Sequence, residues 1–258
     1  IVDNDDKQSA KDCAANWAIK SSIPIHYYCQ PEQNIAKTRN MAVQHATGSH
    51  IAFIDDDEFP ESEWLLNLLL TLRKYNCSGV LGPVKPFFEV EPPQWIVKSR
   101  ICERPTYPTG TLLKNQNETR TGNVLLKRKL FEADQQPFNP AFGKTGGEDV
   151  DFFRRKLEAG FTFRWCNEAP VYEIVPPERF SKKFYIKRAL LRGKVNAKRS
   201  NILSIDTGKS IVAVILYTLA LPFCAIAGRH RFMKYLVKDC DHAGKLIGLF
   251  GIKAVKER

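Results

Sequence analysis

The sequence lacks cysteines in pairs. Its seven cysteines are scattered singly along 258 residues without a CxxC motif, at positions 13, 29, 77, 102, 166, 224 and 240. This odd, dispersed set argues against both a zinc site and a disulfide framework, and it fits a reducing cytosol. There is also no internal repeat, and the first residues do not resemble a signal peptide, because Ile1 and Val2 are followed at once by acidic residues.

Acidic residues are scarce in only one part of the chain. The net charge is +11, yet residues 1–177 contain 21 Lys and Arg against 23 Asp and Glu, whereas residues 178–258 contain 18 against 5. The excess positive charge therefore belongs to the C-terminal part. With 43% hydrophobic residues, a chain of this length can bury one large core, or one core with a small appendage.

Strand-like and helix-like periodicities alternate through the first 85 residues. Short apolar strands are predicted at 1–5, 23–29, 50–54 and 79–84, and helices at 9–20, 34–46 and 61–75. This alternation predicts a parallel α/β sheet. Such sheets bind ligands beyond the carboxyl ends of their strands, and the acidic residues of "VDND" and "FIDDDE" lie at two of these ends.

The pattern breaks in a long proline-rich and polar connection at 86–122, a kind of loop that is usually functional or mobile. Regular structure resumes with an apolar stretch at 123–131 and a Gly-rich turn that enters a helix within 142–160. Two further strands are predicted, at 161–166 and 169–175.

The C-terminal part combines basic and apolar segments. Residues 178–200 predict a basic amphipathic helix, and residues 210–228 are an apolar run interrupted by Pro222, close to the roughly 20 residues of a membrane-spanning helix. The end, 244–258, has the composition of an interfacial helix. This combination favours an anionic membrane surface over nucleic acid, because few aromatic residues are interleaved with the cations. The alternative is a solvated basic helix followed by a buried core helix.

Four adjacent carboxylates, Asp55 to Glu58, follow the apolar strand at 50–54. Like charges this close require a compensating cation. Mg²⁺ and Mn²⁺ prefer carboxylate oxygens, and Mg²⁺ typically uses one or two of them together with substrate phosphates. The run therefore favours a metal that bridges to a diphosphate. The alternative is an exposed turn that caps the helix at 61.

A second acidic pair, Glu148 and Asp149, follows the turn "KTGG" at the start of a predicted helix. The helix dipole favours ionised carboxylates at this end, and such a carboxylate can accept a proton from an incoming hydroxyl. Ordinary capping of the helix explains the same pair. Taken alone, the pair leaves both interpretations open.

Four segments in this order, "VDND", "AKTRNMAVQHATGSHIAFIDDDEFP", "TGNVLLKRKLF" and "FGKTGGEDVDFF", resemble family 2 glycosyltransferases of the GT-A fold, from residue 1 to about residue 195. The stretches "GPV", "ERP", "TGT" and "VPPER" are similar to those of bacterial exopolysaccharide enzymes of the succinoglycan-type β-glucosyltransferase group. The resemblance implies an α/β fold with a mostly parallel sheet flanked by helices, plus a basic and apolar helical tail.

For the nucleotide-sugar donor, the resemblance implies roles for five residues. Asp3 matches the acid that contacts uracil, and Arg39 lies in the segment that approaches the nucleotide. Asp55, Asp56 and Asp57 match the DXD element, in which Asp57 would hold Mg²⁺ or Mn²⁺ and Asp56 the ribose or the sugar.

For the acceptor, the resemblance implies that Asp149 is the catalytic base of an ED motif and that Glu148 orients the acceptor. The QxxRW motif of processive members is replaced by "FYIKRALLRG", in which Arg188 is a candidate phosphate contact. Single-sugar addition is therefore expected. Family members also begin with a strand and a helix before the "VDND" strand, so the resemblance predicts that this first piece is missing here.

The implied enzyme is an inverting transferase that moves a sugar from a UDP-hexose to a lipid-linked or polysaccharide acceptor, at the cytoplasmic side of the inner membrane. A catalytic domain is expected at 1–177, with a nucleotide half at 1–85 and an acceptor half at 86–177, and a membrane-associating region at 178–258.

Two other functions stay open at this level. A phosphatase of the DxD type would need a hydroxyl residue near its second Asp, where Phe59 and Pro60 stand. A truncated, inactive transferase fold that binds a membrane surface or nucleic acid is supported by the basic tail and the missing first strand.

Overall fold

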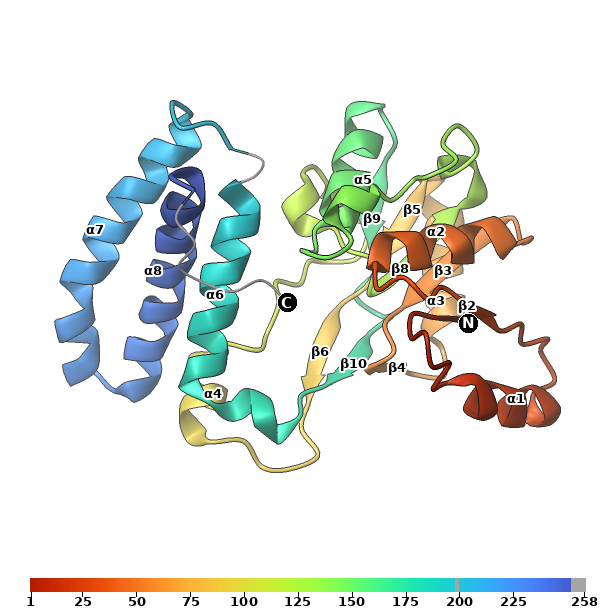
Figure 1. Cartoon of the computed structure of the whole chain (residues 1–258), viewed down its shortest axis with the longest axis horizontal. Coiled ribbons are helices and arrows are strands. Elements are labelled where there is room, and N and C mark those ends of the chain that lie inside the picture. The colour runs from red at the N-terminus through yellow and green to blue at the C-terminus, as the bar shows by residue number, and fades with distance from the viewer. Residues whose placement is uncertain (198–199, 252–258) are drawn as a thin grey trace. The chain divides into compact units, whose positions relative to one another are not determined.

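The computed structural model describes residues 1–197 and 200–251, and the chain divides into two compact units. Unit 1 comprises Ile1–Val84 and Arg104–Tyr172, and unit 2 comprises Lys85–Glu103 and the chain from Glu173 onward. Figure 1 labels many of the helices and strands of both units. The predicted boundary at residue 177, between a catalytic domain and a membrane-associating region, stays a prediction.

Unit 1 alternates short strands with helices, as the periodicity predicts. Its strands are β1 (Val2–Asp3), β2 (Tyr28–Cys29), β3 (His50–Ile54), β4 (Glu58–Pro60), β5 (Gly79–Leu81), β7 (Leu112–Leu113), β8 (Asn123–Lys127) and β9 (Phe163–Trp165). Its helices are α1 (Lys11–Lys20), α2 (Ile35–His45), α3 (Trp64–Tyr75) and α5 (Glu148–Glu158), with the 3₁₀ turns η1 (Gln116–Glu118), η2 (Arg128–Leu130) and η3 (Pro140–Phe142). The strands β6 (Val84–Phe87) and β10 (Val171–Ile174) carry the chain from unit 1 to unit 2 and form a three-stranded sheet in the order β4-β10-β6.

A five-stranded sheet forms the centre of unit 1, in the order β3-β8-β5-β9-β7. The predicted α/β class is confirmed, but this sheet is mixed. β8 is antiparallel to both β3 and β5, β7 is antiparallel to β9, and only β5 and β9 are parallel. The parallel arrangement expected between β3 and β5 does not form, because β8, from the later half of the unit, lies between them and takes their hydrogen bonds.

The predicted strand at 23–29 is only two residues long. Tyr28 and Cys29 pair with Val2 and Asp3 in a separate parallel ladder. Because β1 offers only these two partners, the rest of the predicted strand remains irregular.

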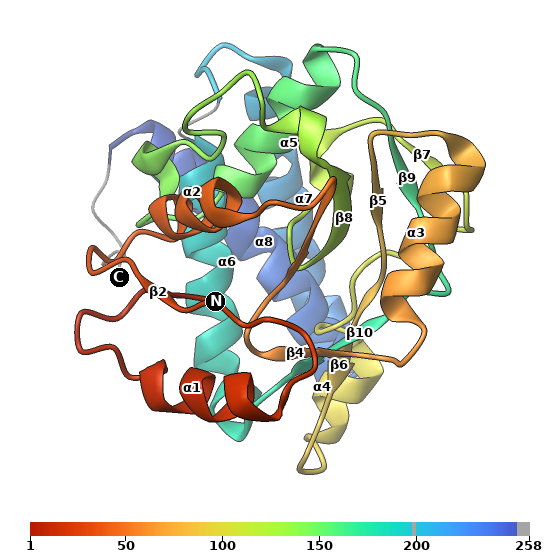
Figure 2. The ribbon, with the colours of Figure 1, turned by 90° about the vertical axis from the view of Figure 1, so that its right-hand side faces the viewer.

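Both faces of the five-stranded sheet are covered by helices (Figure 2). Val124 and Leu126 of β8 lie in a core cluster with Phe153 of α5, whereas Leu125 between them lies in a second cluster with Leu68 of α3. The alternation is the period-2 pattern of a strand buried on both sides. The core thereby fixes α5 and its first turn against the sheet.

Unit 2 is mainly helical. Its elements are α4 (Gln94–Ser99), η4 (Pro177–Phe180), α6 (Lys182–Ala197), α7 (Ile205–Ile226) and α8 (Arg229–Leu249). Helix α8 packs against both α6 and α7 (Figure 1). Gly244 allows the close approach of α8 to α6, because a Cβ there would lie 2.4 Å from the carbonyl oxygen of Leu190.

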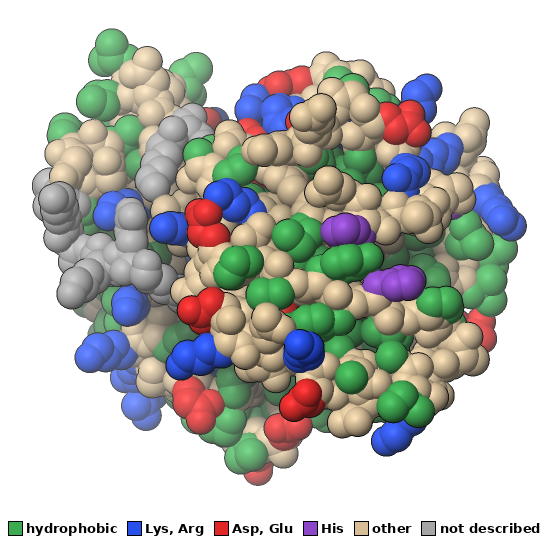
Figure 3. Space-filling model, turned by 45° about the vertical axis from the view of Figure 1, so that its right-hand side comes forward, with side chains coloured by type: hydrophobic (Ala, Val, Ile, Leu, Met, Phe, Trp, Pro, Cys, Tyr) green, Lys and Arg blue, Asp and Glu red, His purple; other side chains and the backbone are tan. Residues whose placement is uncertain are grey.

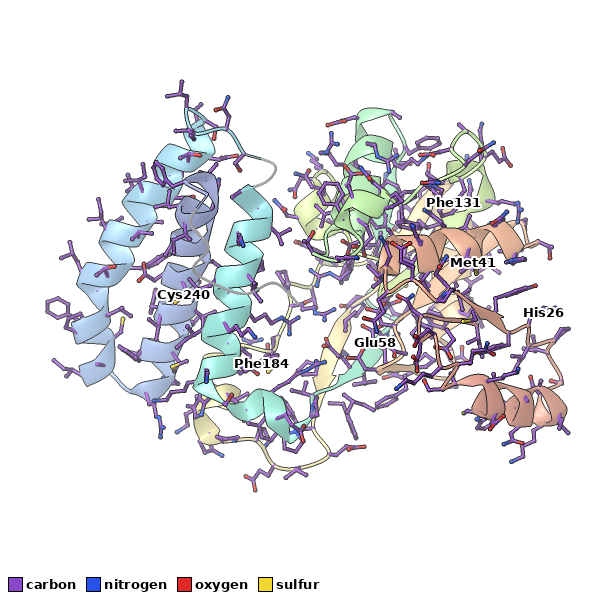
Figure 4. The ribbon with its side chains drawn as sticks, in the orientation of Figure 1. His26, Met41, Glu58, Phe131, Phe184 and Cys240 are labelled. Atoms are coloured by element: carbon purple, nitrogen blue, oxygen red, sulfur yellow. The ribbon has the colours of Figure 1, made fainter. Side chains whose placement is uncertain are left out.

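The core of unit 2 joins α4, α6 and α8 through buried Trp95, Tyr185 and Met233. Phe184 of α6 and Cys240 of α8 pack against this cluster and are labelled in Figure 4. Of the predicted helix at 178–200, residues 198–199 lie outside the described residues, as do residues 252–258 of the predicted apolar end.

Helix α7 contains the apolar run found in the sequence, and it continues past Pro222, where an interruption was expected. Within the described parts of the chain it is the one helix long and apolar enough to cross a membrane, and only 6% of its most apolar stretch is buried. The alternative of a buried core helix is therefore wrong.

Candidate active site

Arg39 lies on α2 and joins two acidic segments. Its Nη1 donates to Oε1 of Glu148 at the start of α5, and its Nη2 donates to Oδ1 of Asp55 after β3, at 3.3 Å. The side chains of Arg39 and Glu148 are 13% and 4% exposed. The guanidinium also lies 6.0 Å from the centre of the Phe138 ring. A buried ion pair thus brings the two acidic motifs of the sequence to one place.

Two asparagines, Asn34 at the N-cap of α2 and Asn40 within this helix, position the loop that leads to α5. Asn34 caps α2 by accepting the Lys37 N–H at 3.1 Å, and its amide donates to the carbonyl oxygen of Pro140 at 3.1 Å. Asn40 donates to the carbonyl oxygen of Phe138 at 2.8 Å and accepts the Phe138 N–H at 2.9 Å. These bonds hold the loop against the same helix that carries Arg39.

The run Asp55 to Glu58 forms the turn between β3 and β4. The Glu58 N–H donates to the carbonyl oxygen of Asp55 at 3.1 Å, and the Asp55 N–H donates to Oε2 of Glu58 at 3.3 Å. The Glu58 side chain is 1% exposed, and its Oε1 lies 4.0 Å from Nη1 of Arg104. Asp56 is exposed and Asp57 is half-buried. Asp55 and Glu58, at the two ends of the run, therefore face arginines, and Asp56 between them is the most accessible to solvent.

The charges in this region act on one another. Burial raises the pKa of Asp55, Arg39 and Arg104 lower it, and the carboxylates of Asp57 and Asp149 raise it. Asp149 thus lies within electrostatic reach of the turn after β3, although it belongs to α5. The structure brings the two acidic motifs together in unit 1, as the resemblance implies.

Glu148 and Asp149 occupy the first turn of α5. The preceding Gly146 and Gly147 have φ values of 79° and 97°, which glycine adopts without strain. Burial raises the pKa of Glu148, and the neighbouring charge of Asp149 raises it further, whereas Arg39 lowers it. Asp149 is half-buried, and its Oδ1 accepts the Val150 N–H at 2.7 Å. The N-cap of α5 is Gly147 without a side-chain cap, so Asp149 supports the helix start only through this bond and its charge, and its catalytic role stays a prediction.

Asp3 lies at the end of β1 and is buried. Its carboxylate accepts the N–H of Ala10 at 3.0 Å and of Asp5 at 3.1 Å, and the hydroxyl of Tyr27 at 2.8 Å. These donors, with Ala10 the largest contribution, lower the pKa of Asp3, and the pKa of Tyr27 is raised to about 12, first by burial and then by Asp3. Asp3 organises its own loop, and its contact with uracil stays a prediction.

Arg188 belongs to unit 2, on the exposed side of α6, with its guanidinium 5.9 Å from the Phe184 ring centre. Its proposed phosphate contact stays a prediction.

A divalent cation fits the donor set of the turn after β3. Across residues 1–197 and 200–251, no three His, Cys, Asp or Glu side chains form a ligand group made of protein alone. Mg²⁺ bound to a diphosphate needs only one or two carboxylates, however. Asp57 supplies a hard oxygen donor in this turn and acts electrostatically on Asp55. These oxygens suit a cation that substrate phosphates hold as well.

Sequence reasoning gave no role to Glu58 or Arg104. Glu58 was one of four similar acids, and Arg104 lies in the stretch "ERP" within the irregular connection. The Glu58 side chain is 1% exposed and accepts the Asp55 N–H, and no sequence pattern reveals either fact. The stretch "ERP" could have pointed to Arg104 only through the resemblance to the exopolysaccharide enzymes.

The fold and the site together define the class. A mixed sheet covered by helices, with carboxylates at a strand end facing an acidic helix N-terminus, is a GT-A arrangement of nucleotide-diphospho-sugar transferases. The model of glycosyl transferase family 2 matches residues 1–133. The chain belongs to this family and is a glycosyltransferase.

A curated relative shares the whole length of the chain. The succinoglycan biosynthesis protein ExoM of Rhizobium meliloti (strain 1021) is 31% identical over 270 residues, covering 100% of this chain and 84% of that protein. The resemblance to exopolysaccharide enzymes is thereby confirmed.

Solved structures share the fold. S. aureus TarS 1–349 in complex with UDP-GlcNAc matches with a TM-score of 0.50 and 12% identity over 98% of this chain and 82% of that one. A longer S. aureus TarS structure matches with a TM-score of 0.50 and 14% identity over 97% and 48%. At these identities the match supports the fold alone.

Proposed function

We propose that this protein is an inverting hexosyltransferase that moves a sugar from a nucleotide-diphosphate sugar, a UDP-hexose, to a lipid-linked or saccharide acceptor during exopolysaccharide synthesis. The observation that carries the proposal is the Arg39 bridge between Asp55 and Glu148, because it places a donor motif beside an acceptor motif. The names of the relatives agree with it: one is a succinoglycan biosynthesis protein, and one was solved with UDP-GlcNAc.

The donor is proposed to lie along the carboxyl ends of β1 and β3. Asp3 contacts the uracil, Asp56 the ribose or the sugar, and Asp57 holds Mg²⁺ or Mn²⁺, while Asp55 stays bound to Arg39. When bound, the cation neutralises charge that develops on the departing diphosphate.

The acceptor hydroxyl is proposed to lie at the first turn of α5. Asp149 removes the hydroxyl proton, the oxygen forms a bond to the anomeric carbon, and the bond from that carbon to the diphosphate breaks on the opposite face. The electron pair of the broken bond leaves with the diphosphate. One displacement of this kind inverts the anomeric configuration. Glu148, held by Arg39, orients the acceptor.

Unit 2 is proposed to dock the enzyme on the cytoplasmic face of the inner membrane. From Ile211 onward the exposed side of α7 is mainly apolar, with Ile211, Leu216, Leu219 and Phe223 between 48% and 74% exposed. Residues from 178 onward also carry the excess of positive over negative charge, 18 Lys and Arg against 5 Asp and Glu, which favours anionic lipids.

The neighbours of α7 favour an in-plane position over a membrane crossing. Thr218 of α7 donates to Asp239 of α8 at 3.3 Å, Ser210 lies 3.3 Å from His242, and Lys245 donates to the carbonyl oxygen of Asp206 at 3.1 Å. A spanning α7 would carry these ionisable groups of α8 toward hydrocarbon, at a cost of about 2.5–3.5 kcal/mol or more for each charge. With α7 in the interface, its apolar side enters the lipid and α8 stays in water.

The donor part of the proposal is tested by calorimetric titration of UDP with and without Mn²⁺. The protein should bind UDP more tightly with Mn²⁺, and Asp57→Asn should lose that gain because an amide is a weaker ligand for hard cations. Glu63→Gln, an exposed acid after β4, is the matched control. Equal affinity of the protein and of Asp57→Asn under both conditions would remove the metal role.

A further inference from the structure

A small cavity lies in unit 1 between the connection after Arg104, the turn η1 and the end of β9. Its volume is about 20 Å³, and its polar lining includes Arg104, Asn117, Glu118, Arg120 and Trp165. A space of this size holds one water-sized group, such as a single oxygen atom of a ligand.

Trp165 offers a donor without an acceptor at this cavity. Trp165 is 5% exposed, and its Nε1 has no hydrogen-bond partner among the residues that the structure describes. The ring is fixed edge-on against Tyr107, with ring centres 5.2 Å apart, and the backbone is held by Thr111 at 3.0 Å and by Gly110 at 2.8 Å. Because buried donors are nearly always paired, an oxygen acceptor is expected in this space, from an ordered water or from a ligand that displaces it.

The charge of the lining selects the kind of oxygen. Two guanidinium groups, Arg104 and Arg120, line the cavity together with one carboxylate. That carboxylate, Glu118, closes its own turn by accepting the N–H groups of Lys114 at 2.8 Å and Asn115 at 3.3 Å. The guanidinium of Arg104 also faces the buried carboxylate of Glu58. Guanidinium groups beside an N–H donor form stronger hydrogen bonds with an oxyanion than with a neutral hydroxyl.

The cavity borders the catalytic region. Arg104 lies 4.0 Å from Glu58 of the acidic turn, and η1, which carries Asn117 and Glu118, packs against α5 with its first-turn acids. We infer that the cavity is a subsite for a carboxylate or phosphate group of the acceptor. The inference depends on the proposed function only for assigning the bound group to the acceptor.

The test follows the four indole N–H signals in a proton–nitrogen correlation spectrum of the full chain, each assigned with a Trp→Phe variant. The probes are inorganic phosphate and glucuronate as oxyanions, glucose as the neutral counterpart, and UDP for the donor. Phosphate and glucuronate should shift the Trp165 signal, and the signal of the exposed Trp17 should stay in place. Arg120→Gln should weaken phosphate binding by about tenfold or more, whereas Lys114→Gln, which removes an exposed charge near the same turn, should not.

Three results overturn the inference: a Trp165 signal that no oxyanion moves, equal shifts with glucose and glucuronate, or a shift with UDP alone, which would assign the cavity to the donor. Arg120→Gln is folded if the indole signals of the other three tryptophans keep the positions that they have in the unsubstituted protein. Calorimetry of UDP on the same sample separates the two proposals, because loss of UDP binding contradicts the proposed function and leaves the Trp165 result intact.

Discussion

At the scale of single residues, the buried pair of Arg39 and Glu148 decides how the site tolerates substitution. Arg39→Met leaves the Glu148 carboxylate buried without its cation, and we expect a loss of about 3–5 kcal/mol in the free energy of unfolding. Urea titration measures it. Lys37→Met on the same helix removes an exposed ion pair with Glu32 and should cost no more than about 1 kcal/mol. If both variants lose the same small amount, the bridge is not a buried pair in solution.

The raised pKa of Glu148 makes the free energy of unfolding depend on pH. Its pKa is raised above the ordinary 4.5 by burial, so the folded protein keeps this proton at pH values where the unfolded chain has lost it. The unfolding free energy contributed by this group therefore falls as pH rises above about 4.5. Glu148→Gln removes the titration.

As pH rises from about 4 to about 8, we expect the free energy of unfolding of the unsubstituted protein to fall relative to that of Glu148→Gln. Urea titrations of both proteins at several pH values in this range measure it. If the unsubstituted protein instead becomes more stable relative to Glu148→Gln as pH rises, Arg39 outweighs burial and lowers the pKa of Glu148.

At the scale of elements, the sequence predicts what is local. The short apolar runs and the helical spacing identify β3, β5, α2, α3 and α5, and the acids stand at the ends of their elements as expected. The position of β8 between β3 and β5 was not predictable, because periodicity does not specify a pairing partner. The same holds for the Arg39 bridge to Glu148, which joins residues that are 109 positions apart.

The start of β8 gives a prediction at this scale. A Cβ on Gly122 would lie 2.9 Å from Oε1 of Glu58 and 3.0 Å from Oδ2 of Asp55. Both atoms are ends of side chains, so Gly122→Ala should displace the carboxylates while the fold persists. We expect sugar transfer to fall by about tenfold to a hundredfold, with a melting temperature within a few degrees of the parent.

Gly208→Ala is the control for this experiment, because a Cβ there meets nothing within 4 Å. An activity assay and a thermal melt of both variants are sufficient. Full activity of Gly122→Ala would mean that the positions of these two carboxylates do not matter for transfer.

At the scale of the whole molecule, the chain combines a site in unit 1 with an apolar and basic surface in unit 2. Acidic and basic side chains are interspersed on the face shown in Figure 3. The membrane proposal therefore depends on the apolar side of α7 together with the positive charge of the chain from residue 178 onward.

Flotation with anionic vesicles tests that surface. The full chain should float with the vesicles at low salt, and the double variant Leu219→Asp and Phe223→Asp should stay in solution, because each change places a carboxylate on the apolar side of α7. Truncation after Leu203 should have the same effect. If the full chain does not float at low salt, the membrane proposal is wrong.

The most direct test of the central claim compares sugar transfer by the protein and by Asp149→Asn, with UDP-hexose and an exopolysaccharide acceptor preparation. Asn caps a helix about as well as Asp, so stability and Mn²⁺-dependent UDP binding should persist. Loss of the proton acceptor should lower transfer by at least about two orders of magnitude. Transfer by Asp149→Asn within a few-fold of an active parent would contradict the account and leave Glu148 as the next candidate base.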